Sequence, residues 1–402
     1  MNDLSKLLAS LGGLGGPGGL GGLMGGDPWA SAAHVAAQIA NEGSSESNVD
    51  PIARLAIEDL ARVARLHVEQ QPGVGLSPHT SVHVVTKTEW ASRSLTAYKP
   101  FFSRFGEALG SANEQMLDPA DPMSAMFGAM LTSLGPMLVA TSAGSMIGHL
   151  GITSMGQYDL PVPRSDDVVL IVASTIEARA ADWDIPLDEL RLWVLIHELT
   201  AHAVLRIPHV AKRLDSLLID FASAFRPDPA ALEAEFGDFS DLSQLAELSQ
   251  KLNDPDKILS LMRSPAHELL VPQLDALVAA ILGFVQATVA LACEGLLPRH
   301  GEIEARVIQL MVDSSPADRF MERLLGLDIS QATFDRGRAF IAGIVDRAGD
   351  EGLARLWADE LDLPTAAEVN APGLWLARIG LDPDLPEGVL EIPDDLSGLD
   401  DL

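Results

Sequence analysis

Apolar residues recur every three or four positions along most of the chain, which is the period of an amphipathic helix. The stretch 50–70 is typical: Asp50 is placed to cap the helix and Pro51 occupies its first turn. The stretch 185–205 follows the same rule, with acidic residues near the positive end of the helix dipole. A short, valine-rich apolar run at 167–174 predicts a strand instead. The pattern therefore predicts a mainly α fold with a few short strands.

The two ends of the chain depart from this helical pattern. Ten glycines fall within residues 11–26, and glycine at that density carries too much backbone entropy to hold a fold. Residues 382–402 contain eight acidic residues, no basic residue and three prolines, which is typical of a solvated acidic tail. We expect a Gly-rich flexible segment over 1–49, one helical domain over 50–381 and a flexible acidic tail. Both flexible ends are candidates for contacting a protein partner.

The formal charge of −30 at pH 7 changes what the chain is expected to bind. Nucleic acids and anionic membranes are repelled by it, so we expect neither as a partner. Residues 122–158 contain no Asp, Glu, Lys or Arg, but their scattered polar and glycine residues favour a buried helix over a membrane span. The single cysteine, Cys293, excludes an intrachain disulfide. Together with a start that does not read as a secretory signal, it favours a cytoplasmic location.

The main candidates for catalytic or metal-binding residues lie in the sequence WVLIHELTAHAVL, residues 193–205. Zinc peptidases commonly place two histidines four residues apart on one helix, with a glutamate directly after the first. Here His197 and His202 are five apart, which turns their side chains about 140° from each other on a regular helix. A π-bulge among residues 199–201 would return His202 to the face of His197. On spacing alone, a metal site and a purely structural use of these side chains both stay open.

Sequence on both sides of this motif resembles a known family. The matching elements, in chain order, are SMGQYDLPVPR (154–164), RLWVLIHE (191–198), ACEGLL (292–297) and RLLGLDISQATFDRGRAFIAGIVDRAG (323–349). Together they resemble an actinobacterial family of zincin-like, gluzincin-type metallopeptidases that is often associated with biosynthesis of a deazaflavin coenzyme. The resemblance covers roughly residues 50–380. It implies a mainly helical zincin-like domain, zinc as cofactor, and a peptide or protein substrate that the sequence does not identify.

The resemblance assigns roles residue by residue. His197 matches the first zinc ligand, and Glu198 matches the general base that activates water. His202 matches the second ligand if the extra residue lies among 199–201. Glu294 matches a glutamate ligand from the later helix. A carboxylate after eighteen uncharged helical residues also needs a reason of its own, either metal binding or emergence into solvent.

The loop GQYDLP supplies two further candidates. Tyr158 and Asp159 are candidates for lining the cleft, where a tyrosine could stabilise an oxyanion. A structural turn held by Asp159 is the alternative. This sequence also departs from the family pattern at Pro298, where gluzincins commonly carry an aspartate that orients the first histidine.

Two functions from different classes follow. The first is a zinc-dependent, metallopeptidase-like hydrolase in which metal-activated water attacks a peptide carbonyl. The second is a catalytically inactive zincin fold that serves as a scaffold or binding protein. The backbone between His197 and His202 separates them, because only a distorted helix aims both rings at one point.

Overall fold

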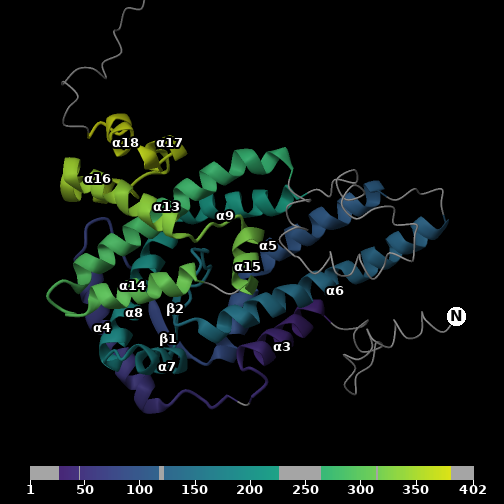
Figure 1. Cartoon of the computed structure of the whole chain (residues 1–402), viewed down its shortest axis with the longest axis horizontal. Coiled ribbons are helices and arrows are strands. Elements are labelled where there is room, and N and C mark those ends of the chain that lie inside the picture. Colours follow the sequence, from purple (N-terminus) through teal and green to yellow (C-terminus); the bar gives the residue numbers. More distant parts are fainter. Residues whose placement is uncertain (1–26, 45, 117–121, 226–263, 314–315, 382–402) are drawn as a thin grey trace, which may run out of the picture. The chain divides into compact units, whose positions relative to one another are not determined.

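A computed structural model gives the fold of the chain (Figure 1). The residues that it describes are 27–44, 46–116, 122–225, 264–313 and 316–381. They are mainly helical with two short parallel strands, so the predicted mainly α fold class is confirmed. The chain divides into two compact units, where the sequence predicts a single helical domain over 50–381. The Gly-rich residues 11–26 and the acidic tail 382–402 lie outside the described residues.

The first unit comprises residues 1–48, 85–154 and 222–263. Its described part includes three helices that pack on one another, and Figure 1 shows two of them, α3 and α6, side by side. These helices are α3 (Pro28–Ala40), α5 (Lys87–Met116) and α6 (Pro122–Thr153). Helix α6 accounts for most of the uncharged stretch 122–158, and it packs against α3 and α5.

Small residues allow α3 and α6 to approach closely. Ala32, Ala36 and Ala40 recur at four-residue spacing on α3 and are fully buried. A Cβ atom added to Gly144 of α6 would lie 2.4 Å from the carbonyl oxygen of Ala32, so the contact has no room for a larger residue. Because α3 is part of this packed bundle, the expectation of a flexible segment over 1–49 is wrong for residues 28–40.

The second unit comprises residues 49–84, 155–221 and 264–402 and carries the candidate chemistry. Its helices follow the predicted amphipathic stretches: the one expected at 50–70 is α4 (Pro51–Glu69), and the one expected at 185–205 is α8 (Leu187–Leu205). Its other helices are α7 (Ala173–Trp183), most of α9 (Pro208–Ser223), α13 (Pro265–Cys293), α14 (His300–Val312), α15 (Pro316–Leu325), α16 (Gln331–Arg355), the 3₁₀ turn η3 (Glu360–Asp362), α17 (Ala366–Asn370) and α18 (Pro372–Arg378).

The two strands β1 (Ser81–Val85) and β2 (Val168–Val172) pair into a small parallel sheet. Strand β2 forms within the apolar run predicted at 167–174, and its last four residues are buried. The backbone N–H of Ser81 donates to the carbonyl oxygen of Asp167 at 3.1 Å. This bond places Asp167 at the start of both strands.

Helix α13 packs against α16 through a close glycine contact. A Cβ atom on Gly283 would lie 2.3 Å from the backbone carbonyl carbon of Gly337. Among the described helices, α13 is also long and apolar enough to cross a membrane, but 78% of its most apolar window is buried inside the protein. Such burial is typical of a core helix.

Helix α8 lies in the core of the second unit, where it packs against α4, α7, α13, α14 and β2. From Leu190 to Leu205 its residues are buried, with His197 alone partly exposed in that span. A polar group buried without a hydrogen bond is costly, so the polar side chains of α8 must find partners inside the protein. Which partners they find decides what the helix can do.

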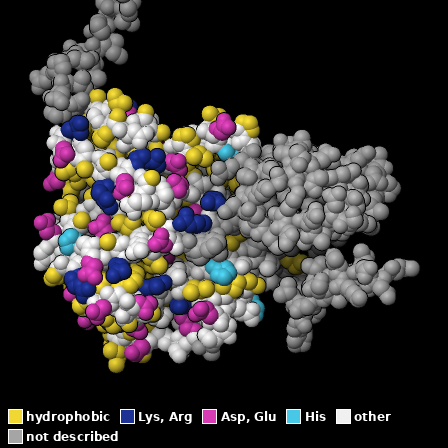
Figure 2. All heavy atoms as spheres, viewed as in Figure 1, with side chains coloured by type: hydrophobic (Ala, Val, Ile, Leu, Met, Phe, Trp, Pro, Cys, Tyr) yellow, Lys and Arg dark blue, Asp and Glu magenta, His cyan; other side chains and the backbone are white. Residues whose placement is uncertain are grey.

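Acidic and basic side chains mix on the surface shown in Figure 2. On that face, the Asp and Glu side chains of the described residues are interspersed with Lys and Arg rather than gathered in one region. The formal charge of −30 therefore does not form a single-sign patch on this part of the surface.

Candidate functional site on helix α8

The backbone between His197 and His202 is an ordinary α-helix. The π-bulge among residues 199–201 that a shared metal would require does not form, because α8 runs as α-helix without interruption from Leu187 to Leu205. On such a helix, the side chain of His202 points about 140° away from that of His197. The residue four positions after His197, which faces the same way as His197, is Ala201. Its methyl group offers no atom that binds a metal.

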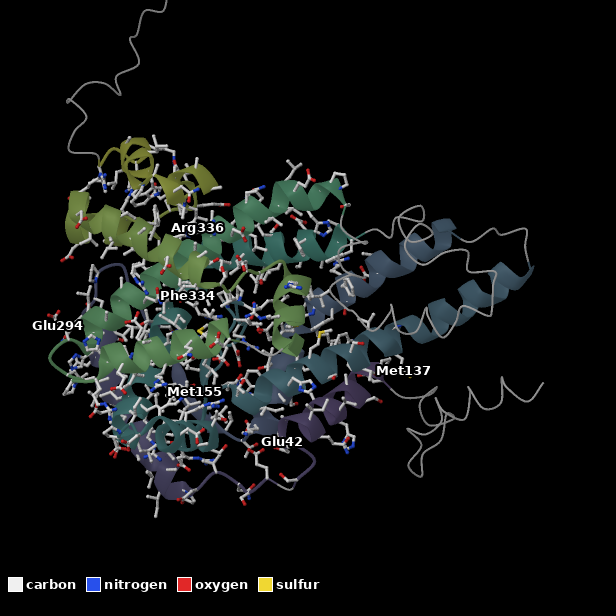
Figure 3. The ribbon with its side chains drawn as sticks, viewed as in Figure 1. Glu42, Met137, Met155, Glu294, Phe334 and Arg336 are labelled. Atoms are coloured by element: carbon white, nitrogen blue, oxygen red, sulfur yellow. The ribbon has the colours of Figure 1, made fainter. Side chains whose placement is uncertain are left out.

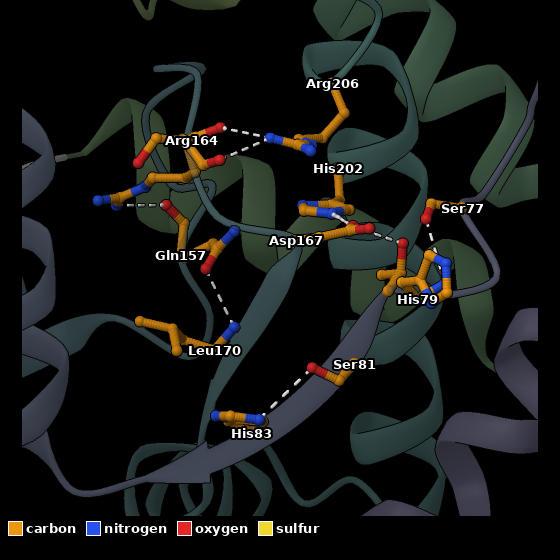
Figure 4. Close-up of polar contacts among 12 residues, drawn as sticks. Ser77, His79, Ser81, His83, Gln157, Arg164, Asp167, Leu170, His202 and Arg206 are labelled. Carbon is orange, nitrogen blue, oxygen red and sulfur yellow. Dashed lines mark hydrogen bonds and ion pairs between the residues drawn. The ribbon is translucent and has the colours of Figure 1, made fainter.

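Both ring nitrogens of His202 have protein partners. Nδ1 lies 2.8 Å from the hydroxyl of Tyr158, and Nε2 lies 2.9 Å from Oδ1 of Asp167. The same Asp167 oxygen accepts a hydrogen bond from the hydroxyl of Thr80 at 2.7 Å. Figure 4 shows His202 and Asp167 in this chain of contacts, at the end of the small sheet. The histidine thus ties α8 to the residues that begin both strands.

The chemistry of these partners fixes where the protons lie. Burial raises the pKa of Asp167, but hydrogen bonds from His202 and Thr80 outweigh burial and hold that pKa well below its usual range. An ionised Asp167 only accepts, so Nε2 of His202 donates to it. Burial raises the pKa of Tyr158 far above its ordinary value, so its hydroxyl keeps its proton and donates to Nδ1. No lone pair of His202 is left for a metal ion.

Glu198 fastens α8 to the loop that carries GQYDLP. Its Oε2 accepts hydrogen bonds from the backbone N–H of Gln157 at 2.8 Å and of Tyr158 at 3.1 Å. The side chain is buried, and a Cβ atom on Gly156 would lie 2.2 Å from its Cδ, so glycine is required where the loop passes. A general base must reach the water that it deprotonates. Glu198 is instead closed off by the loop that it holds.

His197 faces a different part of the core. Its ring stacks on that of Trp193, with centroids 5.3 Å apart and planes 13° from parallel. Its Nδ1 lies 3.4 Å from Oε1 of Glu198. His197 also lines a small cavity together with Gln286 and Glu304, from α13 and α14.

Glu294 does not reach this region. It caps the C-terminal end of α13 with an extended backbone, φ −61° and ψ 127°, and its side chain is exposed. Figure 3 labels it in the loop that follows α13. Of the two explanations that the sequence leaves open for this carboxylate, the structure favours emergence into solvent.

The sequence offers Tyr158 and Asp159 as candidates for lining a cleft. Tyr158 is buried and its hydroxyl is bonded to His202, while Asp159 beside it is partly exposed. Arg164 donates to the carbonyl oxygen of Gln157, and the Gln157 side chain accepts from the backbone N–H of Leu170 in β2, as Figure 4 shows. The loop is therefore held by hydrogen bonds to protein groups on several sides, which favours a structural role for it.

A hydrolytic zinc ion takes three protein ligands and keeps a fourth position open for water. Within the described ranges, no three His, Cys, Asp or Glu side chains are grouped so that they could hold a metal ion. The proposed set does not converge, because His202 is bonded on both nitrogens and Glu294 is exposed. These residues do not fit a zinc ion.

Three residues of this arrangement were missed from the sequence: Thr80, Gly156 and Asp167. Asp167 stands directly before the predicted strand, and Gly156 precedes the loop residues already singled out. Neither position has a spacing rule that links it to His202 or Glu198, which are more than thirty residues away in the chain. Only the folded arrangement brings them together.

A His-Glu pair on a helix is a sequence pattern that this chain shares with zinc metallopeptidases. The chain belongs to the zincin-like metallopeptidase family, whose sequence profile matches residues 28–376. The match begins at the first residue of α3. Both compact units therefore contribute to the family's sequence pattern.

The fold also resembles a solved structure from Chloroflexus aurantiacus described as "a putative hydrolase with a novel fold". The two share 20% sequence identity with a TM-score of 0.60, over 88% of this chain and 98% of that one. At that identity the likeness shows a shared fold. No curated protein matches the chain.

Proposed function

We propose that this chain is a non-catalytic member of the zincin-like metallopeptidase family that acts as a binding protein. Family membership supports a hydrolase-like function in general terms. The observation that carries the finer proposal is the double engagement of His202, with Tyr158 on one ring nitrogen and Asp167 on the other. A ligand histidine needs one nitrogen free for the metal.

The other residues of the motif support the same reading. A zinc hydrolase needs two converging imidazoles, a third ligand and a carboxylate that touches the bound water. In this chain the residue on the same face of the helix as His197 is Ala201. One carboxylate oxygen of Glu198 accepts hydrogen bonds from two backbone N–H groups. Each departure alone weakens the site, and together they remove it.

Zinc-dependent hydrolysis is the second candidate, and one observation favours it. The family to which the chain belongs is named for metallopeptidases and normally binds zinc. For this function to hold, α8 must distort locally and His202 must leave both of its partners. Such a rearrangement breaks two buried hydrogen bonds at once.

Metal content distinguishes the two candidates. We expect full-length protein, purified, incubated with zinc and desalted, to retain far less than one zinc per chain, with no change in the His197→Ala variant. We also expect no cleavage of casein or of a mixed peptide library with zinc present. One zinc per chain that is lost in His197→Ala, with peptide cleavage lost in Glu198→Gln, would establish the hydrolase instead.

A further inference from the structure

Helix α4 carries apolar side chains on two opposite faces. One face is buried and is formed by Ala53, Ile57, Ala64 and Val68, and α4 packs against α8 and α13. The other face carries four large apolar side chains that are between 38% and 76% exposed: Ile52, Leu55, Val63 and Leu66. We call these four exposed residues the α4 stripe.

The residues of the α4 stripe lie on one side of the helix. At about 100° per residue, their directions fall within about 80° of one another and lie about 150° from the centre of the buried face. A helix on the surface of a monomer normally turns one apolar face to the core and a polar face to water. An additional exposed apolar face is typical of a surface that contacts another protein.

The α4 stripe is symmetric about Asp59. Ile52 and Leu66 lie seven residues on either side of Asp59, and Leu55 and Val63 lie four residues on either side of it. In a twofold-symmetric pair, each contact occurs twice with the two copies exchanged. If the twofold axis crosses α4 at Asp59, two antiparallel copies place Ile52 level with Leu66 of the partner subunit. Leu55 is then level with Val63 of the partner subunit.

The charge of α4 does not oppose this pairing. Residues 51–69 contain three acidic and three basic side chains, whereas the whole chain has a formal charge of −30. Close to the axis, Asp59 and Arg62 form an exposed ion pair. Two antiparallel copies bring two such pairs together, so the two guanidinium groups offset the repulsion between the two Asp59 carboxylates. The surface is therefore self-complementary in charge as well as in its apolar positions.

We propose that the α4 stripe binds a second copy of this chain, as an antiparallel helix pair about a twofold axis at Asp59. The symmetry favours a second copy, because a partner of different sequence makes each contact once and requires no such symmetry. The inference concerns self-association and goes beyond the proposed function, because it holds whether or not the chain binds zinc.

The length of α4 sets the expected strength of the dimer. The helix has 19 residues, which makes it about 28 Å long. One pair of such helices offers less contact than the roughly 1,600 Å² that a typical stable complex buries. We therefore expect a weak dimer, with a dissociation constant on the order of 10 to 100 μM.

Sedimentation equilibrium of the full-length protein measures this association. We expect the mass to rise from the monomer toward twice that value as the concentration passes through the expected dissociation constant. Leu55→Glu should raise the dissociation constant at least about tenfold, because the dimer buries the new charge in both copies. Leu66→Glu should act in the same direction and decides if Leu55→Glu fails to fold. The matched control is Leu269→Glu, at an exposed leucine of α13 outside the stripe, which should dimerise like the wild type.

Cysteine cross-linking tests the position of the axis. In the antiparallel pair, Asp59→Cys places two thiols next to each other at the axis. Gln70→Cys, at an exposed position on the same side of α4, leaves its two thiols about 33 Å apart. With diamide as oxidant, we expect a disulfide-linked dimer from Asp59→Cys and none from Gln70→Cys. The native Cys293 is buried and is present in both variants, so it does not affect the comparison.

The proposal is overturned if the wild type keeps the monomer mass at concentrations well above the expected dissociation constant. The stripe would then be left to a partner of different sequence. It is also overturned if Leu55→Glu and Leu66→Glu dimerise like the wild type, or if Gln70→Cys cross-links as readily as Asp59→Cys. Zinc retention in the metal assay would refute the non-catalytic function without changing these results, so the two failures are distinguishable.

Discussion

The polar side chains on the two sides of helix α8 differ in whether they have hydrogen-bond partners. Toward the sheet and the GQYDLP loop, Glu198 and His202 have donors and acceptors matched to each of their contacts. Toward α13 and α14, the amide of Gln286 is buried without a partner and Glu304 makes no ion pair among the described residues. A closed network holds a fold together, whereas a buried polar group without a partner destabilises it.

This contrast underlies the proposal that the His-Glu motif has a structural role in this chain. A histidine and a glutamate in a helical H-E pattern suggest catalysis, yet here they stabilise the loop and the strands that surround them. Gln286, whose buried amide has no hydrogen-bond partner among the described residues, belongs to no familiar motif. The following predictions begin with Glu198 and His202, on the side of α8 that faces the GQYDLP loop and the sheet, where the largest effects are expected.

The largest effect is expected from Glu198→Ala. The change leaves the backbone N–H groups of Gln157 and Tyr158 buried without an acceptor. We expect a loss of about 2 to 6 kcal/mol in the free energy of unfolding, because each of the two unsatisfied buried groups costs about 1 to 3 kcal/mol. Urea denaturation followed by circular dichroism measures it. Glu294→Ala is the control and should change stability by less than about 0.5 kcal/mol, since its side chain is exposed.

His202→Ala should have the next largest effect. It removes two buried hydrogen bonds and leaves the Tyr158 hydroxyl without its acceptor. The expected loss in the free energy of unfolding is about 2 to 4 kcal/mol, from lost hydrogen bonds and a new cavity. If the same denaturation experiment gave no loss of stability, His202 would not hold the loop and the strands together.

The same histidine predicts a dependence of stability on pH. Burial lowers the pKa of His202 in the folded state from its ordinary value of 6.5. The unfolded chain therefore binds a proton first, so this contribution to stability is present above pH 6.5 and is lost as the pH falls below it. The loss per pH unit is at most about 1.4 kcal/mol. Denaturation of wild type and His202→Ala between pH 7.5 and 5.5 isolates it, because the variant should lack this part of the slope.

The smallest effect is expected at Gln286 of α13, on the other side of α8. Gln286→Leu should raise the free energy of unfolding by about 1 kcal/mol, because it replaces a buried amide that has no partner among the described residues with an apolar side chain. A destabilised variant would mean that the amide has a hydrogen bond in the folded protein. Thermal unfolding of the two proteins in parallel decides between these outcomes.

The sequence predicts most of the fold but only part of the site. Periodicity places α4 and α8 within a few residues of their observed ends, because burial of one face sets the spacing of apolar residues. Periodicity does not predict that α3, which follows the Gly-rich residues in the chain, packs on α6 through small residues. Helix propensity over 28–40 is a local property, whereas its packing depends on Gly144, a hundred residues later.

The partners of the histidines could not be predicted for the same reason. The five-residue spacing predicts that the two histidine rings diverge unless the helix distorts. The structure shows α8 as a regular helix, so the rings diverge. What His202 meets after it diverges depends on Asp167 and Tyr158, which a loop and a strand bring to it. The likeness to a family of zinc peptidases gives the fold correctly, while the ligand set inferred from it does not converge.

The state of the His202 ring tests the central claim most directly. Nitrogen NMR of ¹⁵N-histidine-labelled protein reports which ring nitrogen carries the proton and whether a metal is bound to the other. We predict a neutral ring with its proton on Nε2, unchanged when one equivalent of zinc is added. A zinc-induced shift of either His202 nitrogen to a metal-bound value would contradict the account and restore α8 as a metal site.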